Sequence, residues 1–207
     1  MSQYFKVHPV NPQRRLLLRA VEIIQSGGIV VYPTDSCYAF GWHIGDKAAL
    51  EKIRRIRQTE RDHDFTLVCR DLSEIATYAK VDNSEYRLLR AHTPGPYTFI
   101  LRATHETPKR LQDPKRKSIG IRVPDHPIAQ ALLDVLGEPL MSSTLLLPGD
   151  SLPLTEPEVV VERVGKLVDA IIDGGACGME PTSIIDLSRG EVTVIRKGKG
   201  DTSAFEA

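Results

Sequence analysis

Long apolar runs are missing from this sequence. No stretch approaches the ~20 consecutive apolar residues that a helix needs to span a bilayer. Residues 1–15 contain no apolar core of the kind found in secretory signal peptides. These absences argue against a membrane-spanning or exported protein, and we expect a cytoplasmic protein with no membrane partner.

Cysteine is scarce, and the histidines are scattered. The three cysteines, Cys37, Cys69 and Cys177, are odd in number, far apart and without a C-x-x-C pair. This pattern indicates reduced thiols and argues against a zinc site. None of the 6 histidines has the spacing of metal ligands. We therefore expect no metal site and no tightly bound cofactor.

The common nucleotide and hydrolase motifs are also missing. The sequence contains no G-x-x-x-x-G-K-[ST], G-x-G-x-x-G, H-E-x-x-H or G-x-S-x-G. The 27 basic residues balance the 27 acidic residues, so the chain has no overall field that would attract a polyanion. Any nucleotide site must therefore be unconventional, and any anion site must come from local clustering of charge.

Helical and strand patterns alternate along most of the chain. The predicted helices cover residues 11–26, 46–58, 71–79, 84–90, 125–137 and 155–165. The predicted strands cover 28–33, 65–70, 97–103, 118–124, 139–147 and 168–175, with a closing hairpin at 182–198 that turns at Arg189-Gly190. We expect N-terminal caps at Asn11, Asp46, Asp71 and Asp125. The pattern predicts one α/β domain, residues 1–207, with a mixed sheet.

Two short stretches place hydroxyl groups where strands end. Residues 33–37, PTDSC, come directly after a buried-strand pattern and carry hydroxyl, carboxylate and thiol groups. Residues 142–145, SSTL, follow a second strand pattern and supply hydroxyl groups near LPGD. Such groups either cap a turn or strand end, or face a ligand.

Basic residues gather in two segments. Residues 47–61 contain six basic and two acidic residues, and residues 109–122 contain six basic residues and one acidic residue. A single charge run is usually a solvated face. Two runs from distant parts of a neutral chain could instead converge in an anion-binding cleft.

Four segments together resemble the YrdC/YciO-type threonylcarbamoyl-AMP synthase family. GGIVVYPTDSCYAFG at residues 27–41 is similar to the signature GGxVxxPTDTxYGLG, and TPGPYTFIL at 93–101 is similar to xPGPxTxxL. SIGIRVPDHPIAQALL at 118–133 and EPTSIIDLS at 180–188, followed by VTVIRKGKG, resemble the later segments in the family's order. Within the family, the chain is similar to the paralogue of the bacterial synthase.

The resemblance implies a fold, a pocket and its residues. The fold would be α/β, a twisted open mixed sheet with helices on its faces (YrdC/RibB-like) and a large concave basic surface. The pocket would receive ATP, with Mg²⁺, together with threonine and bicarbonate, and no side chain is assigned as a catalyst. The implied substrate- and nucleotide-binding residues are Thr34, Arg55, Arg57, Thr59, Arg61, Arg122, Ser142, Thr144, Ser183 and Arg196.

The chain departs from the family pattern at two positions. Synthases carry K-x-R where this chain reads Arg57-Gln58-Thr59, although Arg55 and Arg57 could serve instead. Synthases also carry S-x-N where this chain reads Thr144-Leu145-Leu146. Leucine can neither donate nor accept the hydrogen bonds of an asparagine amide. These changes predict weak or altered adenylate-forming activity.

Three interpretations of function follow. The favoured one is a protein that binds RNA, a nucleotide or both, because the resemblance also implies binding of double-stranded RNA. RNA would then contact Lys52, Arg54, Arg55, Lys115, Arg116 and Lys117 through its phosphates. The alternative is a genuine threonylcarbamoyl-AMP synthase acting in tRNA modification. The third is an α/β domain with incidental charge.

Overall fold

The computed structural model describes residues 2–59, 65–113 and 115–206. The strands in this part of the chain are β1 (Gln3–Lys6), β2 (Val30–Tyr32), β3 (Ala39–His43), β4 (Thr66–Val68), β5 (Ala79–Lys80), β6 (Tyr97–Ala103), β7 (Ser118–Arg122), β8 (Leu140–Thr144), β9 (Ala170–Asp173), β10 (Ser183–Asp186) and β11 (Thr193–Arg196). They form one sheet in the order β1-β9-β2-β3-β8-β4-β7-β6-β10-β11, with β5 paired to β6. Parallel and antiparallel pairs both occur, which confirms the predicted mixed α/β sheet.

The helices are α1 (Arg14–Gln25), α2 (Lys47–Arg57), α3 (Leu72–Tyr78), α4 (Asn83–His92), α5 (Pro127–Leu136) and α6 (Pro157–Val164). The predicted caps of α2 and α3 are confirmed, because the carboxylates of Asp46 and Asp71 accept from backbone N–H groups of the first turn. Two predicted caps are wrong. Helix α1 begins after Gln13 rather than at Asn11, and neither Gln13 nor His126, which precedes α5, caps its helix through a side chain.

Three strands escaped the sequence pattern, namely β1, β3 and β5. Strand β1 has only four residues and lies at one end of the strand order, so a single buried residue marks it. Strand β3 starts two residues after the PTDSC turn, and four of its five residues are buried. A strand buried on both faces lacks the polar–apolar alternation that identifies a half-exposed strand.

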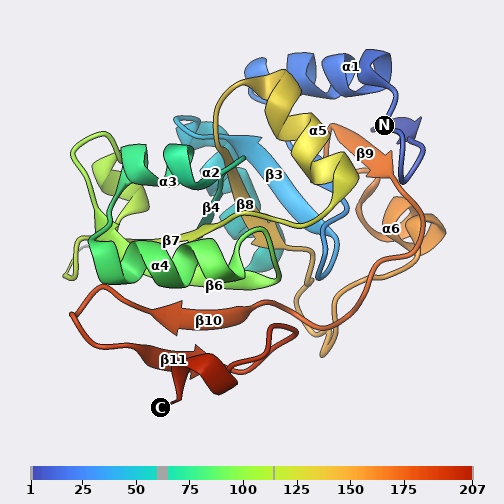
Figure 1. Ribbon diagram of the computed structural model, residues 1–207. Helices are drawn as coiled ribbons and strands as arrows, with labels where there is room; N and C mark the ends of the chain where they lie inside the picture. Colours follow the sequence, from blue (N-terminus) through green and yellow to red (C-terminus); the bar gives the residue numbers. More distant parts are fainter. Residues whose placement is uncertain (1, 60–64, 114, 207) are drawn as a thin grey trace.

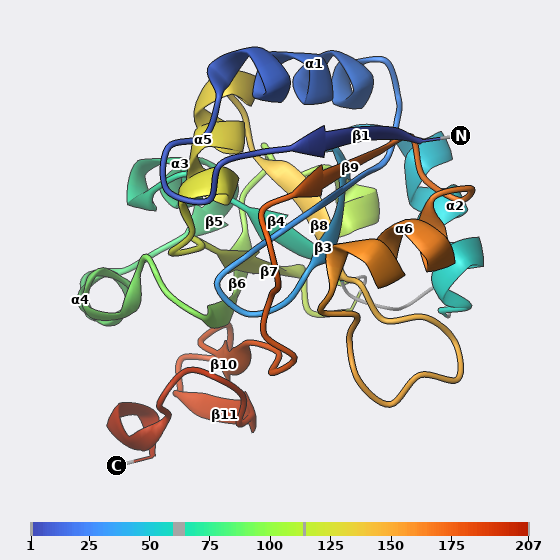
Figure 2. The same cartoon turned by 90° about the vertical axis from the view of Figure 1, so that its right-hand side faces the viewer.

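Helices pack on both faces of the sheet (Figure 1). Helices α1 and α5 bury one apolar cluster against β1, β2 and β9, and Figure 2 shows β1 and β9 side by side below α1. A second, larger cluster joins α2, α3, α4 and α6 to the other face, through residues such as Leu67, Met141 and Phe99. The β10–β11 hairpin lies at the opposite end of the molecule from α1 (Figure 1).

Strand alternation prepares the position of the functional site. Val68 pairs with Leu140, and both belong to the cluster under α1 and α5. Two residues along on the same face, Thr66 pairs with Ser142, and here both side chains line a cavity. The face that is apolar beneath α5 therefore becomes polar where the cavity begins.

Candidate functional site

A cavity of about 270 Å³ lies over the polar part of the sheet. Serine and threonine hydroxyl groups form much of its wall, and apolar side chains from residues 146–153 and 179–184 complete it. Three arginines, Arg57 from α2, Arg122 from β7 and Arg196 from β11, contribute positive charge. The serine and threonine residues that line it are Thr34, Ser36, Thr66, Thr98, Ser142, Ser143, Thr144, Ser151 and Thr182.

The PTDSC turn is capped by its own threonine. The Thr34 hydroxyl donates to the Cys37 carbonyl over 2.6 Å and accepts from the backbone N–H groups of Ser36 and Cys37 at 3.2 Å. Thr34 is buried but still lines the cavity. The hydroxyl thus fixes the turn, and the turn presents Ser36 and Cys37 to the cavity.

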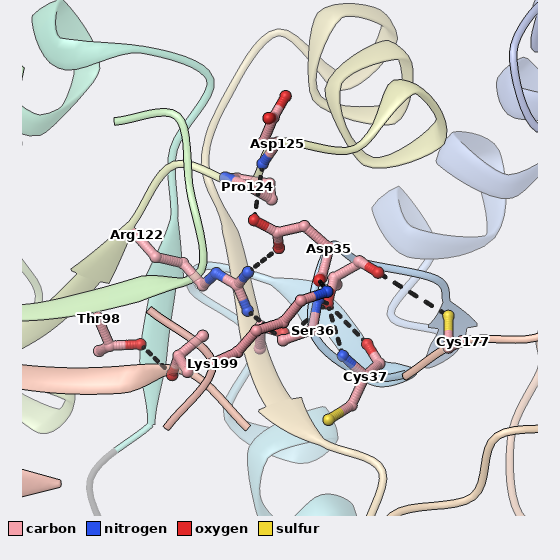
Figure 3. A network of polar contacts seen from close by, with 12 residues as sticks. Asp35, Ser36, Cys37, Thr98, Arg122, Pro124, Asp125, Cys177 and Lys199 are labelled. Carbon is pink, nitrogen blue, oxygen red and sulfur yellow. Dashed lines mark hydrogen bonds and ion pairs between the residues drawn. The ribbon is translucent and has the colours of Figure 1, made fainter. Parts of the chain in front are cut away.

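Asp35 and Arg122 form the structural centre of the site (Figure 3). The Arg122 guanidinium donates through Nη2 to the Asp35 carboxylate and through Nη1 to the Ser36 hydroxyl, the latter over 3.2 Å. The second Asp35 oxygen accepts from the Asp125 backbone N–H at 2.9 Å. Both ionic side chains are 9% exposed, so the pair joins the turn to β7 in a largely dehydrated environment.

Arg57 reaches the cavity from the end of α2. Its guanidinium donates to the Ser143 hydroxyl and, through Nε over 3.3 Å, to the Leu146 carbonyl. Burial lowers the pKa of Arg57 below its usual value, but a guanidinium remains charged in proteins. Leu146 itself lines the cavity, so an apolar side chain occupies the wall at the position where the family pattern has asparagine.

Arg196 is held by Thr182, the residue that precedes β10. Its Nε and Nη2 atoms donate to the Thr182 carbonyl over 3.0 and 2.8 Å. The Thr182 hydroxyl hydrogen-bonds Thr98 at 2.9 Å, and both hydroxyls line the cavity. Arg196 is exposed as a residue, but partial desolvation of its guanidinium lowers its pKa as well.

Six of the ten predicted pocket residues line the cavity. These are Thr34, Arg57, Arg122, Ser142, Thr144 and Arg196. Ser183 does not, because strand alternation turns its side chain away from the cavity that Thr182 and Ile184 face. Arg55 is exposed on α2, Thr59 lies outside the lining, and Arg61 lies outside the described residues.

The predicted RNA-binding residues do not gather in the cavity. Several are paired with carboxylates, as in Lys52 with Asp169 at 3.2 Å and Arg54 with Glu51 at 2.8 Å. Arg116 lies 4.0 Å from carboxylate oxygens of Asp113 and Asp186. Arg55, Lys115 and Lys117 are exposed.

The thiol in the cavity wall is not a ready nucleophile. Burial raises the pKa of Cys37, although the positive charge of Arg122 opposes the shift. Burial also raises the pKa of Cys177 to about 12.

In the described ranges, no three His, Cys, Asp or Glu side chains lie together as metal ligands would. Nor does any helix in those ranges combine the length and apolarity needed to cross a bilayer.

Sequence reasoning missed several residues of the site. Ser143, Thr98 and Thr182 line the cavity, and Ser36 receives a hydrogen bond from Arg122. A detectable signal existed for the threonines, since Thr98 and Thr182 lie inside the two family segments TPGPYTFIL and EPTSIIDLS. Lys199 also reaches this region, where its ammonium donates to the Asp35 carbonyl (Figure 3).

Known proteins resemble this chain in sequence and in fold. The Sua5/YciO/YrdC family model, described as "Telomere recombination", matches residues 22–198. The uncharacterized protein YciO of Escherichia coli (strain K12) is 55% identical over 99% of this chain and 100% of that protein. The E. coli YciO crystal structure superposes with a TM-score of 0.95 over 99% of this chain and 100% of that chain.

Two further relatives carry more specific names. A putative threonylcarbamoyl-AMP synthase of Methanocaldococcus jannaschii is 30% identical over 95% of this chain and 93% of the relative. The crystal structure of P. abyssi Sua5 complexed with L-threonine is 22% identical, with a TM-score of 0.87 over 95% of this chain and 58% of that chain. The second likeness is one of fold.

Proposed function

The chain belongs to the Sua5/YciO/YrdC family, and on this premise we propose that it binds an adenine nucleotide and has weak or altered adenylate-forming activity. The observation that carries the proposal is the convergence of Arg57, Arg122 and Arg196 in one hydroxyl-lined cavity. Guanidinium groups present forked N–H donors that match phosphate oxygens. Hydroxyl groups beside them can bind the remaining polar atoms of a nucleotide or amino acid.

The adenylate-forming reaction suits a site built from cations and hydroxyls. Threonine and bicarbonate form a carbamate with loss of water, and a carbamate oxygen then attacks the α-phosphorus of ATP. The bond from this phosphorus to the bridging oxygen breaks, and pyrophosphate leaves with the electron pair. Fixed guanidinium groups stabilise the charge that develops on the phosphate oxygens, and no protein nucleophile is needed. ATP would bring Mg²⁺, which neutralises charge on its outer phosphates.

The apolar wall at Leu146 supports weak rather than efficient activity. Removing one positioned hydrogen-bonding group from such a site commonly costs ~3–4 kcal/mol of transition-state stabilisation, or about two to three decades in rate. Leu146 contributes backbone groups alone to the polar network: its carbonyl accepts from Arg57, and its N–H donates to the Thr144 carbonyl. Binding through the arginines does not depend on the missing amide.

Calorimetric titration with Mg·ATP beside a pyrophosphate-release assay tests this proposal. We expect saturable ATP binding to the intact chain and slow pyrophosphate release that requires both threonine and bicarbonate. Absence of ATP binding in the titration would overturn the proposal. A fast, threonine-dependent release would overturn the weak-activity part and establish the genuine synthase instead.

Binding of structured RNA is a second candidate function. Strands β4 and β7 are parallel neighbours, with Thr66 opposite Gly120, so the chain enters both at the same edge of the sheet. The exposed residues Lys115 and Lys117 lie at this entry to β7, and Arg55 is exposed near the end of α2. These three exposed cations could contact RNA phosphates without reading base sequence.

The salt dependence of binding to a duplex RNA tests this second function. Fluorescence anisotropy should show affinity that falls steeply with salt and is the same for unrelated sequences. Binding that is insensitive to salt, or limited to one sequence, would count against contacts made through phosphates.

A further inference from the structure

Lys199 extends the positive charge of the site beyond the cavity. Its side chain leaves the C-terminal segment and reaches Asp35 on the PTDSC turn, where Nζ donates to the backbone carbonyl (Figure 3). Lys199 also lines a neighbouring hollow of about 380 Å³, which includes Cys177 and Met179. Met179 lines both spaces, so the hollow adjoins the cavity.

Two glycines hold the backbone of Lys199 tightly against the sheet. A Cβ atom at Gly198 would lie 2.3 Å from the Pro181 carbonyl oxygen, and one at Gly200 would lie 2.4 Å from the Tyr97 ring. No side chain fits at either position, so the segment can approach β10 and Tyr97 only with glycine on both sides of Lys199.

Ser183 fastens the same segment. Its hydroxyl accepts from the Gly198 N–H at 3.0 Å and donates to the Gly200 carbonyl over 2.5 Å. The Lys199 N–H donates to the Pro181 carbonyl over 2.9 Å. The serine that was predicted to bind substrate therefore positions a lysine that was not predicted.

The ammonium of Lys199 has spare binding capacity. No carboxylate in the described ranges lies within 4.0 Å of it, whereas Lys197, two residues earlier, lies 2.7 Å from Glu206. An ammonium has three N–H donors, and the Asp35 carbonyl engages one of them. The positive charges of Arg122, Arg196 and Lys199 each act to lower the pKa of the Cys37 thiol in the cavity wall, so all three cations lie within electrostatic reach of this residue.

We propose that Lys199 is a binding residue of the anion site and contacts the outer anionic group of the ligand, the β- and γ-phosphates of a nucleotide or the pyrophosphate product. This inference rests on the proposed nucleotide binding. The arginines of the cavity would hold the α-phosphate. Lys199 would contact the outer phosphates, which extend past the PTDSC turn toward the hollow. Glu156 and Glu180 also line this hollow, so the favourable position for an anion is next to Lys199.

Lys199→Met, with Lys197→Met as a control of equal charge change, tests the inference. Calorimetric titrations with Mg·ATP, pyrophosphate and AMP compare the two variants with the unchanged chain. We expect Lys199→Met to weaken binding of ATP and pyrophosphate about tenfold and to change AMP binding little. Lys197→Met and Lys199→Arg should bind all three ligands as the unchanged chain does.

The outcomes separate this inference from the proposed function. An unchanged chain that binds none of the three ligands would overturn the nucleotide function, and the role of Lys199 with it. Normal binding of ATP by Lys199→Met would overturn the role of Lys199 alone. Equal losses for AMP and ATP, with a lower melting temperature, would show that Lys199 merely supports the turn, which would also overturn the inference.

Discussion

Helix α2 carries two arginines that illustrate the difference between charge inside and outside the cavity. Arg55 is exposed, whereas Arg57 enters the cavity and donates to Ser143 and Leu146. Both belong to the same basic run in the sequence. The run itself therefore says little about function. What distinguishes Arg57 is that it lines the same cavity as Arg122 and Arg196, which come from elements far away in the chain.

The partners of the two groups differ as well. In the cavity, Arg57 donates to the Ser143 hydroxyl and Arg196 donates to the Thr182 carbonyl. The neutral partner of Arg196 leaves most of its charge for a ligand. Outside the cavity, Lys52, Arg54 and Arg116 face carboxylates. Arg122 combines both kinds of partner, since it binds Asp35 and Ser36.

The largest expected effect is on stability, at the buried pair. Arg122→Met should lower the free energy of unfolding by about 3–5 kcal/mol, because it leaves the Asp35 carboxylate buried without its partner. Arg116→Met removes an arginine that is 46% exposed and should cost less than about 1 kcal/mol. Urea denaturation measures both. Equal losses would mean that Arg122 is no more important to the fold than a surface cation.

The next effect is a gain of catalysis at the apolar wall. Leu146→Asn should raise threonine-dependent pyrophosphate release by up to about a hundredfold, since it restores an amide beside Arg57. Leu152→Asn, at a residue that also lines the cavity but is 55% exposed, is the matched control. A gain shared by both variants would contradict a specific role for position 146.

A smaller effect separates the two arginines of α2. Arg57→Met should weaken ATP binding about tenfold, because a charge-assisted contact to phosphate is lost. Arg55→Met should leave ATP binding unchanged, since this side chain is exposed outside the lining. Titration calorimetry compares them. Similar affinities in the two variants would show that the cavity is not where ATP binds.

The smallest effect concerns the exposed lysines Lys115 and Lys117 before β7. Lys115→Glu combined with Lys117→Glu should weaken duplex RNA binding several-fold for every sequence alike and flatten its salt dependence. The same variant should bind ATP normally, because neither lysine lines the cavity. Anisotropy titrations at several salt concentrations provide the measurement, and unaltered RNA affinity would remove these lysines from the interface.

Much of the fold could be predicted because local patterns agree with it. Apolar spacing marked the helices, and Asp46 and Asp71 marked two of their starts. Strand β3 could not be found in this way, since Ala39–His43 is buried on both faces. Its two faces are covered by the two apolar clusters, with Ala39 in one and Phe40 and Trp42 in the other, and these clusters form only in the folded chain.

The site was predicted less completely than the fold. The family segments pointed to Arg122 and Arg196, both of which line the cavity. The predicted residue Ser183 does not line the cavity, whereas its neighbour Thr182 does, because successive side chains of an extended segment point to opposite faces. Lys199 carried no local signal of function, because its position depends on how closely Gly198 and Gly200 approach β10 and Tyr97.

The sheet order also constrains how this protein can be made. Strand β2 pairs with β9, so Val30 and Val31 can form this ladder only after Ala170 and Ile171 have been synthesised. Strand β1 pairs with the same strand and depends on it in the same way. During synthesis on the ribosome, the N-terminal strands must therefore remain unpaired on that side until most of the chain has emerged. Contacts between residues so far apart in sequence slow folding, and exposed strand edges invite aggregation in the interval. We expect the nascent chain to need protection by chaperones until β9 has left the exit tunnel.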